Sequence, residues 1–404
     1  MTTKEPNPVV IYTDDRTRPR GGPVQFRTPL CDLFGIDHPI LLAGMGGASG
    51  PDLAAAVSNA GGLGVLGAAA CPPAVLDEWI TRTKKLTDRP FGVDTLLPAS
   101  VPQNMESLAA DAASGKFDPM TLIPPEVLAA RDAFLEAEGL KVPERAGEMS
   151  QRLGFVKDFF SAQLEVVLDH KVALYVSGLG VPSPEFIEAA HSAGMKVMGV
   201  AGQTRHARKL VDGGVDGLVA QGHDGGGHNS PIGTMALLPQ VVDEVAGAVP
   251  VIGAGGICDG RGIAAALILG CGGAWIGTRF LATEESEIPR FQKEAIVAAH
   301  DKDTLVSKSV TGKPARMIRG KWAEQVEQGK IQPLPMPLQS MVSGPVMAAA
   351  MVAERADVWP GFAGQGAGLV HDIRPAADIV SDLVAEAVEA LDGCRSVPGL
   401  QVGR

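Results

Sequence analysis

The sequence lacks an apolar run long enough to cross a membrane, and it lacks a cluster of basic residues. Its start, residues 1–23, is a polar leader that contains prolines and has no apolar segment of the signal-peptide kind. Acidic residues outnumber basic ones by 46 to 35, which gives a formal net charge of −11. We therefore expect a cytoplasmic protein with no membrane or nucleic-acid partner.

Cysteine is scarce, and its spacing is uninformative for metals. The five residues are Cys31, Cys71, Cys258, Cys271 and Cys394, an odd number without any C-x-x-C pair. This argues against a disulfide framework and against a zinc site, so we expect no metal. We interpret Cys258 as a small buried filler rather than a reactive thiol.

Glycine and proline, by contrast, are abundant, at 50 and 30 residues. Many glycines directly follow short apolar runs, and alanine-rich helical stretches separate most of these runs. The runs are 39–43, 63–66, 91–96, 172–176, 196–200, 216–220, 249–254 and 274–276. Eight strand–helix alternations predict an α/β fold, a (β/α)8 TIM barrel. An open doubly wound sheet is the alternative, but no G-x-G-x-x-G opens the first helix.

Two segments exceed the repeat, which predicts the domain organisation. The barrel is assigned to 24–100 and 155–284, and the charged, helix-prone insertion 101–154 is assigned to a lid or interface. A helical C-terminal region, 285–404, follows, with helices expected at 288–300 and 345–354. The amphipathic stretch 375–391 is expected to return to the barrel as its eighth helix.

The stretch 249–281 looks built to hold one phosphate group. Its first strand ends in Gly255 and Gly256, and its second ends in Gly277 and Thr278. Neighbouring strand ends with glycine can direct backbone N–H groups at one anion. In (β/α)8 barrels the phosphate site usually follows strands seven and eight. Two tight turns that need glycine for a positive φ are the alternative.

A glycine-rich loop with two histidines, 221–230, follows the sixth strand, where barrel enzymes place catalytic residues. His228 is a candidate general base or hydrogen-bond donor, and a histidine that only bonds backbone is the alternative. A metal site of His223, Asp224 and His228 is disfavoured, because a glycine-rich loop holds ligands poorly. Met45, in an apolar setting after the first strand, can pack on a flat ring.

Four segments resemble the nitronate monooxygenases (2-nitropropane dioxygenases) and the related FMN-dependent enoyl-ACP reductases. They are LLAGMGGASGPDLAAAVSNAGGLGVLGA (41–68), GLVAQGHDGGGHNS (217–230), VIGAGGICDGRGIAAALILGCGGAWIGTRFLATEE (251–285), and TGKPARMIR (311–319) with WPGFAGQGAGLV (359–370). The resemblance implies FMN as cofactor and His228 as the active-site histidine. It implies cofactor contacts at Met45, Gly46, Asp94, Gln221, Gly226, Gly255, Gly256, Trp275, Ile276, Gly277 and Thr278. Asp94 and Trp275 depart from the family, which often has Asn and Gln there.

The resemblance implies FMN-dependent oxidation of alkyl nitronates or nitroalkanes with O2. One alternative is an NAD(P)H-dependent FMN reductase that acts on an enoyl thioester or a quinone. Another is an IMP-dehydrogenase-like barrel, which needs a cysteine on a loop after the eighth strand. Only Cys394 lies beyond Cys271, which weakens that alternative. The expected partners are a small-molecule substrate with O2 or NAD(P)H, and a homodimer is compatible with the sequence.

Overall fold

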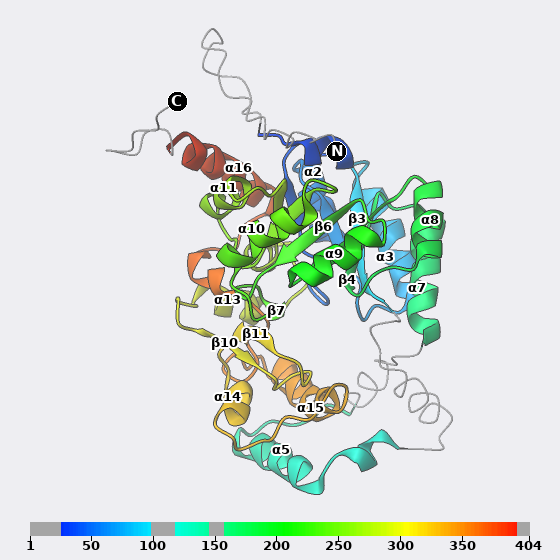
Figure 1. Ribbon diagram of the computed structural model, residues 1–404. Coiled ribbons are helices and arrows are strands. Elements are labelled where there is room, and N and C mark those ends of the chain that lie inside the picture. The colour runs from blue at the N-terminus through cyan, green and yellow to red at the C-terminus, as the bar shows by residue number, and fades with distance from the viewer. Residues whose placement is uncertain (1–25, 98–117, 145–156, 394–404) are drawn as a thin grey trace.

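A computed structural model describes residues 26–97, 118–144 and 157–393 (Figure 1). The polar leader, Cys394 and much of the predicted insertion lie outside these residues. None of the described helices is long and apolar enough to cross a membrane.

Eight parallel strands form one sheet with the order β1-β9-β8-β6-β5-β4-β3-β2. Leu41 also pairs with Leu63, the residue just before β2, so the first and last strands of this order meet and close the barrel. The strands are β1 Ile40–Leu42, β2 Gly64–Gly67, β3 Phe91–Leu96, β4 Leu174–Leu179, β5 Lys196–Ala201, β6 Gly217–Gln221, β8 Val251–Ala254 and β9 Gly273–Ile276. Each coincides with a predicted run to within a few residues, and the predicted TIM barrel is confirmed.

The strands are almost wholly apolar because both of their faces are buried. Side chains such as Val219 and Ile252 fill the barrel interior, together with Leu30 and Phe34 from α1 (Pro29–Phe34). Alternate side chains such as Leu218 pack outward against the helices. Helix α1 contacts the start of β9, so it covers the amino-terminal end of the barrel. The carboxyl ends of the strands are left for the site.

A helix follows each strand of the barrel. These helices are α2 Pro51–Asn59, α3 Pro73–Leu86, α7 Lys157–His170, α8 Pro184–Ser192, α9 Thr204–Asp212, α10 Thr234–Val245, α11 Gly260–Ile268 and α16 Ala376–Gly393. Sequence reasoning missed α7 and placed the start of α10 four residues too late. The final helix α16 packs on α2 and α11, as predicted for the eighth helix.

The C-terminal region is not only helical, which corrects the prediction for 285–404. It contains β10 (Thr304–Ser307) and β11 (Ala315–Ile318), which form an antiparallel sheet with β7 (Gly227–His228). The short helix α12 (Thr278–Leu281) precedes this region. Helices α13 (Arg290–Val297), α14 (Lys321–Glu327) and α15 (Leu338–Val352), the short 3₁₀ helix η3 (Gln365–Leu369) and α16 belong to it. The start predicted at Pro345 is wrong, because that proline lies inside α15.

A second hydrophobic core joins the insertion to the C-terminal region. Helix α5 (Pro125–Ala137) and the 3₁₀ helix η2 (Pro119–Leu122) pack on α15, and Figure 1 shows them on the side of α15 away from the barrel. The ring of Phe134 lies 5.3 Å from that of Trp322, centroid to centroid, inside this core. We call residues 118–144 and 304–362 together the cap.

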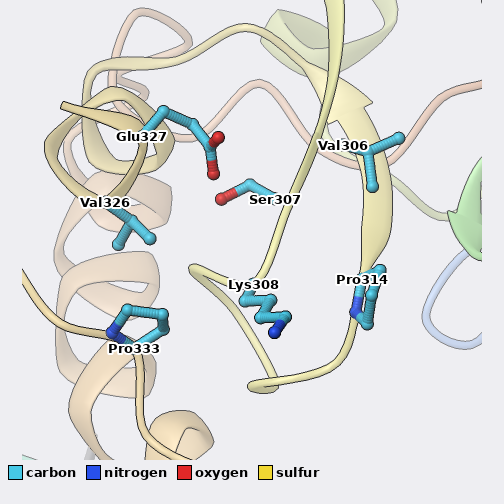
Figure 2. A pocket seen from close by; sticks show the side chains of 7 residues that line it. All are labelled: Val306, Ser307, Lys308, Pro314, Val326, Glu327 and Pro333. Atoms are coloured by element: carbon cyan, nitrogen blue, oxygen red, sulfur yellow. The ribbon is translucent and has the colours of Figure 1, made fainter. Parts of the chain in front are cut away.

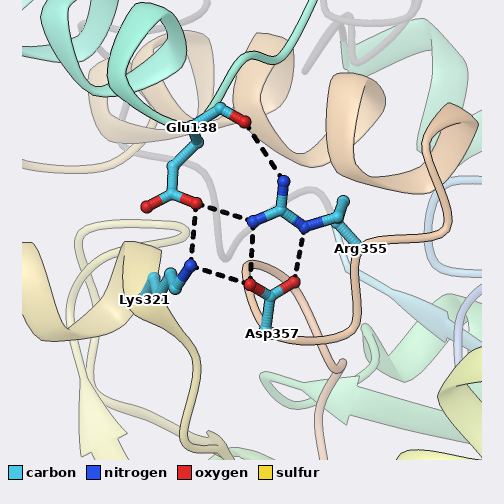
Figure 3. Close-up of polar contacts among 4 residues, drawn as sticks. All are labelled: Glu138, Lys321, Arg355 and Asp357. Atoms are coloured by element: carbon cyan, nitrogen blue, oxygen red, sulfur yellow. Dashed lines mark hydrogen bonds and ion pairs between the residues drawn. The ribbon is translucent and has the colours of Figure 1, made fainter.

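A charged network ties the two parts of the cap together (Figure 3). Glu138 accepts from Arg355 at 2.6 Å and from Lys321 at 2.8 Å. Asp357 pairs with the same two cations at 2.6 and 2.9 Å. These hydrogen bonds, that of Lys321 to Glu138 foremost, hold the pKa of Glu138 below its usual value. The end of α5 is thereby fixed to α14 and to the segment after α15.

Candidate functional site

The adjacent ends of β8 and β9 form the predicted cradle. Gly255 and Gly256 have φ values of +108° and +74°, a region that side chains disfavour. A Cβ on Gly255 would lie 2.6 Å from the Thr234 hydroxyl oxygen, so no other residue fits there. Within the described chain, no hydrogen-bond acceptor meets the N–H groups of Gly255, Gly256, Gly277 and Thr278. Four such donors at two neighbouring strand ends suit an anion.

A loop from the C-terminal region encloses this cradle. Gly364 donates its N–H to the Thr278 hydroxyl at 2.9 Å, and Gln365 donates to the Asp224 carbonyl at 2.9 Å. A Cβ on Gly226 would meet the backbone of Ala363 and Gly364 at 2.8 Å. The glycine at 226 is thus explained by this close approach of two loops. Sequence reasoning gave the loop no role, although its run of glycines was the signal.

Met45 follows β1 and lies beside the cradle. Its N–H donates to the Ser49 hydroxyl at 2.8 Å, and its sulfur is 3.3 Å from where a Cβ of Gly277 would stand. A side chain at 277 would therefore displace the thioether. Gly46, next in the chain, has open space where its side chain would be. The arrangement leaves a polarizable apolar group next to backbone donors.

Asp94 is a carboxyl buried near the carboxyl end of β3, on the inner face of the sheet. It is 9% exposed, and a Cβ on Gly44 would stand 2.3 Å from its own Cβ. The backbone of Gly178 hydrogen-bonds to it, but burial outweighs that contact and raises its pKa well above the usual value. Burial therefore favours the protonated form of Asp94, which has a donor and an acceptor like an amide.

His228 lies on β7, and residues far away in the sequence hold it. Its Nε2 is 2.7 Å from the hydroxyl oxygen of Thr311, and its carbonyl accepts from Gln221 at 3.0 Å. Partial desolvation, helped by the Lys313 ammonium, lowers the pKa of His228. The ring is thus neutral at pH 7. Thr311 belongs to a quoted motif, but sequence reasoning did not assign it a role.

His223 serves the loop itself. Its ring Nδ1 is 2.8 Å from the Ser230 carbonyl, to which it can only donate. Its backbone N–H donates to the Ile232 carbonyl. Its neighbour Asp224 accepts from the N–H of Thr234 at the start of α10. These contacts account for both residues by loop structure.

The remaining predicted residues flank the cradle with buried side chains. Trp275 belongs to the cluster inside the barrel and Ile276 to the cluster between sheet and helices. Cys258 is also buried, and burial raises the pKa of its thiol to about 12, which makes it unreactive at neutral pH. This agrees with its interpretation as a filler.

A pocket of about 340 Å³ lies in the cap (Figure 2). Its lining includes Ser307 at the end of β10, Lys308 after it, Pro314 before β11, and Glu327 at the end of α14. It shares no residue with the predicted site. The predicted residues gather instead at the carboxyl ends of β1, β3, β6, β8 and β9 and on β7.

Comparison with known proteins agrees with this arrangement. Residues 27–386 match the sequence profile of the nitronate monooxygenase family. A Mycobacterium tuberculosis protein named as a monooxygenase is 38% identical over 90% of this chain and 97% of its own length. An indene-carboxyl-CoA dehydrogenase of the same organism is 35% identical over 76% of this chain and 70% of its own length.

The structure of a nitroalkane oxidase from Streptomyces ansochromogenes superposes with a TM-score of 0.74 and 33% identity, over 91% of this chain and all of that one. Matches of this extent and identity are not explained by the barrel fold alone. The chain therefore belongs to the nitronate monooxygenase family and is an oxidoreductase.

Proposed function

We propose that this protein binds FMN and oxidises alkyl nitronates or nitroalkanes with O2 as the electron acceptor. The observation that carries the proposal is the set of four backbone N–H groups at the ends of β8 and β9 that meet no acceptor among the described residues. They suit a single phosphate group. No dinucleotide fingerprint opens the first helix, which favours FMN over FAD.

The residues around the cradle fit the rest of this cofactor. Gly255, Gly256, Gly277 and Thr278 would hold the phosphate, with no Cβ in the way on the glycines. The Met45 thioether would pack on the flat ring system, as sulfur does on aromatic faces. Bound FMN would supply the redox chemistry by accepting electrons from the substrate.

His228 is proposed to contact the substrate, as a hydrogen-bond donor or as a base. Its ring is neutral near pH 7, because partial desolvation and Lys313 disfavour the imidazolium. The same lysine places a positive charge near the ring. A nitronate is an anion, so such a charge favours its binding over that of a neutral molecule.

The test is an anaerobic mixture of the purified protein with a nitronate, NADH and NADPH in turn, followed by flavin absorbance. We expect the nitronate alone to bleach the flavin and O2 to restore its colour. A colourless protein, or a flavin that no nitronate reduces, would contradict the proposal.

A second candidate is an FMN-dependent reductase or dehydrogenase of a thioester. It is favoured by the 35% identity to a carboxyl-CoA dehydrogenase. A reductase would take electrons from NADH or NADPH, which would bleach the flavin without oxygen, and an enoyl thioester would restore its colour. A dehydrogenase would take electrons from its thioester substrate, which would itself bleach the flavin. The nitronate would then leave the absorbance unchanged.

A further inference from the structure

The loop between β10 and β11 delivers one hydroxyl to His228. Strand β11 pairs with β7 in a register that sets Ala315 opposite His228. Thr311, four residues before Ala315, places its Oγ1 2.7 Å from Nε2 of the ring. The two partners are 83 residues apart in the sequence. One ring nitrogen is therefore engaged by the protein, and Nδ1 is the nitrogen left for a substrate.

Buried donors in the cap fix the loop that carries Thr311. The Ser309 carbonyl accepts from the indole N–H of Trp322 at 3.0 Å and from the Gln339 amide at 2.7 Å. The Ser343 hydroxyl donates to the Val310 carbonyl at 2.7 Å. Both residues that precede Thr311 are thus anchored to α14 and α15. The hydroxyl is held in place by the packed core of the cap.

The local contacts also favour one direction for the hydrogen bond. The Thr311 oxygen accepts from the backbone N–H of Lys313 at 3.3 Å, and in the described part of the chain Nε2 is the acceptor within reach of its own proton, so donation to Nε2 satisfies that proton. A neutral imidazole has one donor and one acceptor nitrogen. If the hydroxyl donates to Nε2, the ring proton must lie on Nδ1.

We propose that Thr311 is a positioning residue: its hydroxyl donates to Nε2 of His228 and holds the ring in the tautomer that presents Nδ1–H to the substrate. The inference rests on the proposed function. An N–H aimed at the substrate stabilises a negatively charged oxygen of a nitronate, and it cannot remove a proton from a nitroalkane. The protein would therefore use preformed nitronates in preference to neutral nitroalkanes.

The test is ¹⁵N NMR of histidine-labelled protein as purified, with His228→Ala used to assign the signals. We expect the wild type to be protonated at Nδ1 and acceptor-like at Nε2. Thr311→Val should populate the Nε2–H tautomer, and Thr311→Ser should restore the wild-type signals. A wild type protonated at Nε2, or a tautomer that Thr311→Val leaves unchanged, would overturn the proposal.

Kinetics give a second readout and separate this inference from the function itself. Thr311→Val should lower kcat/KM for a nitronate about threefold to tenfold, the effect of one neutral hydrogen bond. Thr311→Ser should stay near the wild type and keep its pH profile. Thr311→Val can change the tautomer as expected while neither the wild type nor any variant oxidises nitronates. In that case the positioning role stands and the proposed function fails.

Discussion

The barrel and the cap are built from different kinds of contact. Hydrogen bonds between neighbouring parallel strands hold the barrel, and the helices that cover most of it follow those strands directly in the sequence. The cap joins Phe134 to Trp322, with strands β4 to β9 between them in the sequence, and adds a charged network at its edge. The cradle lies on the barrel, whereas the ring of His228 is held by the cap. Cofactor retention and turnover should therefore respond to different mutations.

The largest effect is expected at the cradle. Gly256→Glu would place a carboxylate against the proposed phosphate, and like charges at contact cost several kcal/mol. FMN affinity should fall by about two to three orders of magnitude. Heat release of flavin from the purified variant, followed by chromatography, measures this.

Gly247→Glu is the matched control. A side chain at Gly247 would meet nearly the same backbone strain as one at Gly256, because φ is +77° there against +74° at Gly256, but Gly247 has open space around it. It should keep its flavin. Equal flavin loss in both variants would assign the effect to strain rather than to charge.

The next effect separates turnover from binding. His228→Ala should keep FMN but lose about 10- to 10²-fold in kcat/KM for a nitronate, the usual effect of one hydrogen bond to a charged group. His223→Ala should be mild, because that ring only supports the Ser230 carbonyl. A larger loss of kcat/KM in His223→Ala than in His228→Ala would assign the substrate contact to His223.

A smaller effect is expected where the cap is tied together. Glu138→Ala removes the partner shared by Arg355 and Lys321 and should loosen residues 118–144 and α15, with a few-fold loss in kcat and no loss of FMN. Hydrogen exchange measured by mass spectrometry locates the change. Glu136→Ala, an exposed carboxylate on the same helix, should change nothing. Faster exchange in the barrel strands would contradict this separation of barrel and cap.

The same network predicts how the cap responds to acid. The pKa of Glu138 and that of Asp357 are lowered in the folded protein by their cations. Their stabilising contribution is therefore complete above the ordinary values of 4.5 and 3.8 and is lost as the pH falls through the folded values. Protection of the cap amides in the wild type, measured as the exchange rate relative to the intrinsic rate at the same pH, should fall below about pH 4. In Glu138→Ala this loss of protection with falling pH should be smaller.

The smallest effect belongs to Asp94. Its folded pKa is raised, so the unfolded chain binds fewer protons above pH 3.8, and stability falls as the pH rises towards the folded value. Asp94→Asn keeps a donor and an acceptor but cannot ionise. Its free energy of unfolding should gain on that of the wild type with rising pH, by at most about 1.4 kcal/mol per pH unit. Asp88→Asn, at an exposed turn, should follow the wild type, and a constant difference for Asp94→Asn would show that Asp94 is ionised.

The barrel could be predicted because its signals are local. Most strands read as an apolar run with glycine close behind it, so Gly255, Gly256, Gly277 and Thr278 could be predicted as the ends of two neighbouring strands. The amphipathic spacing of 375–391 likewise predicts a helix that returns to the barrel, and α16 contacts α2 and α11 in the structure.

The cap was not predictable in the same way. Strands β10 and β11 are four residues each, and β10 is polar at both ends. Their pairing with β7 depends on a contact between residues about ninety positions apart. Helix α7 was not predicted, although Phe160, Gln163 and Val167 have helical spacing. The predicted insertion ends at residue 154, only three residues before α7 begins.

Helix α16 has a consequence for how the chain acquires its structure. It fills the gap between α2 and α11, and its Glu386 caps the first N–H of α11. The last barrel strand ends at Ile276, a hundred residues before α16 begins at Ala376. During synthesis the apolar surface at the seam of β1 and β9 stays uncovered until those residues have left the ribosome. The ring is completed by long-range association, which slows folding and exposes the nascent chain to aggregation until its final helix arrives.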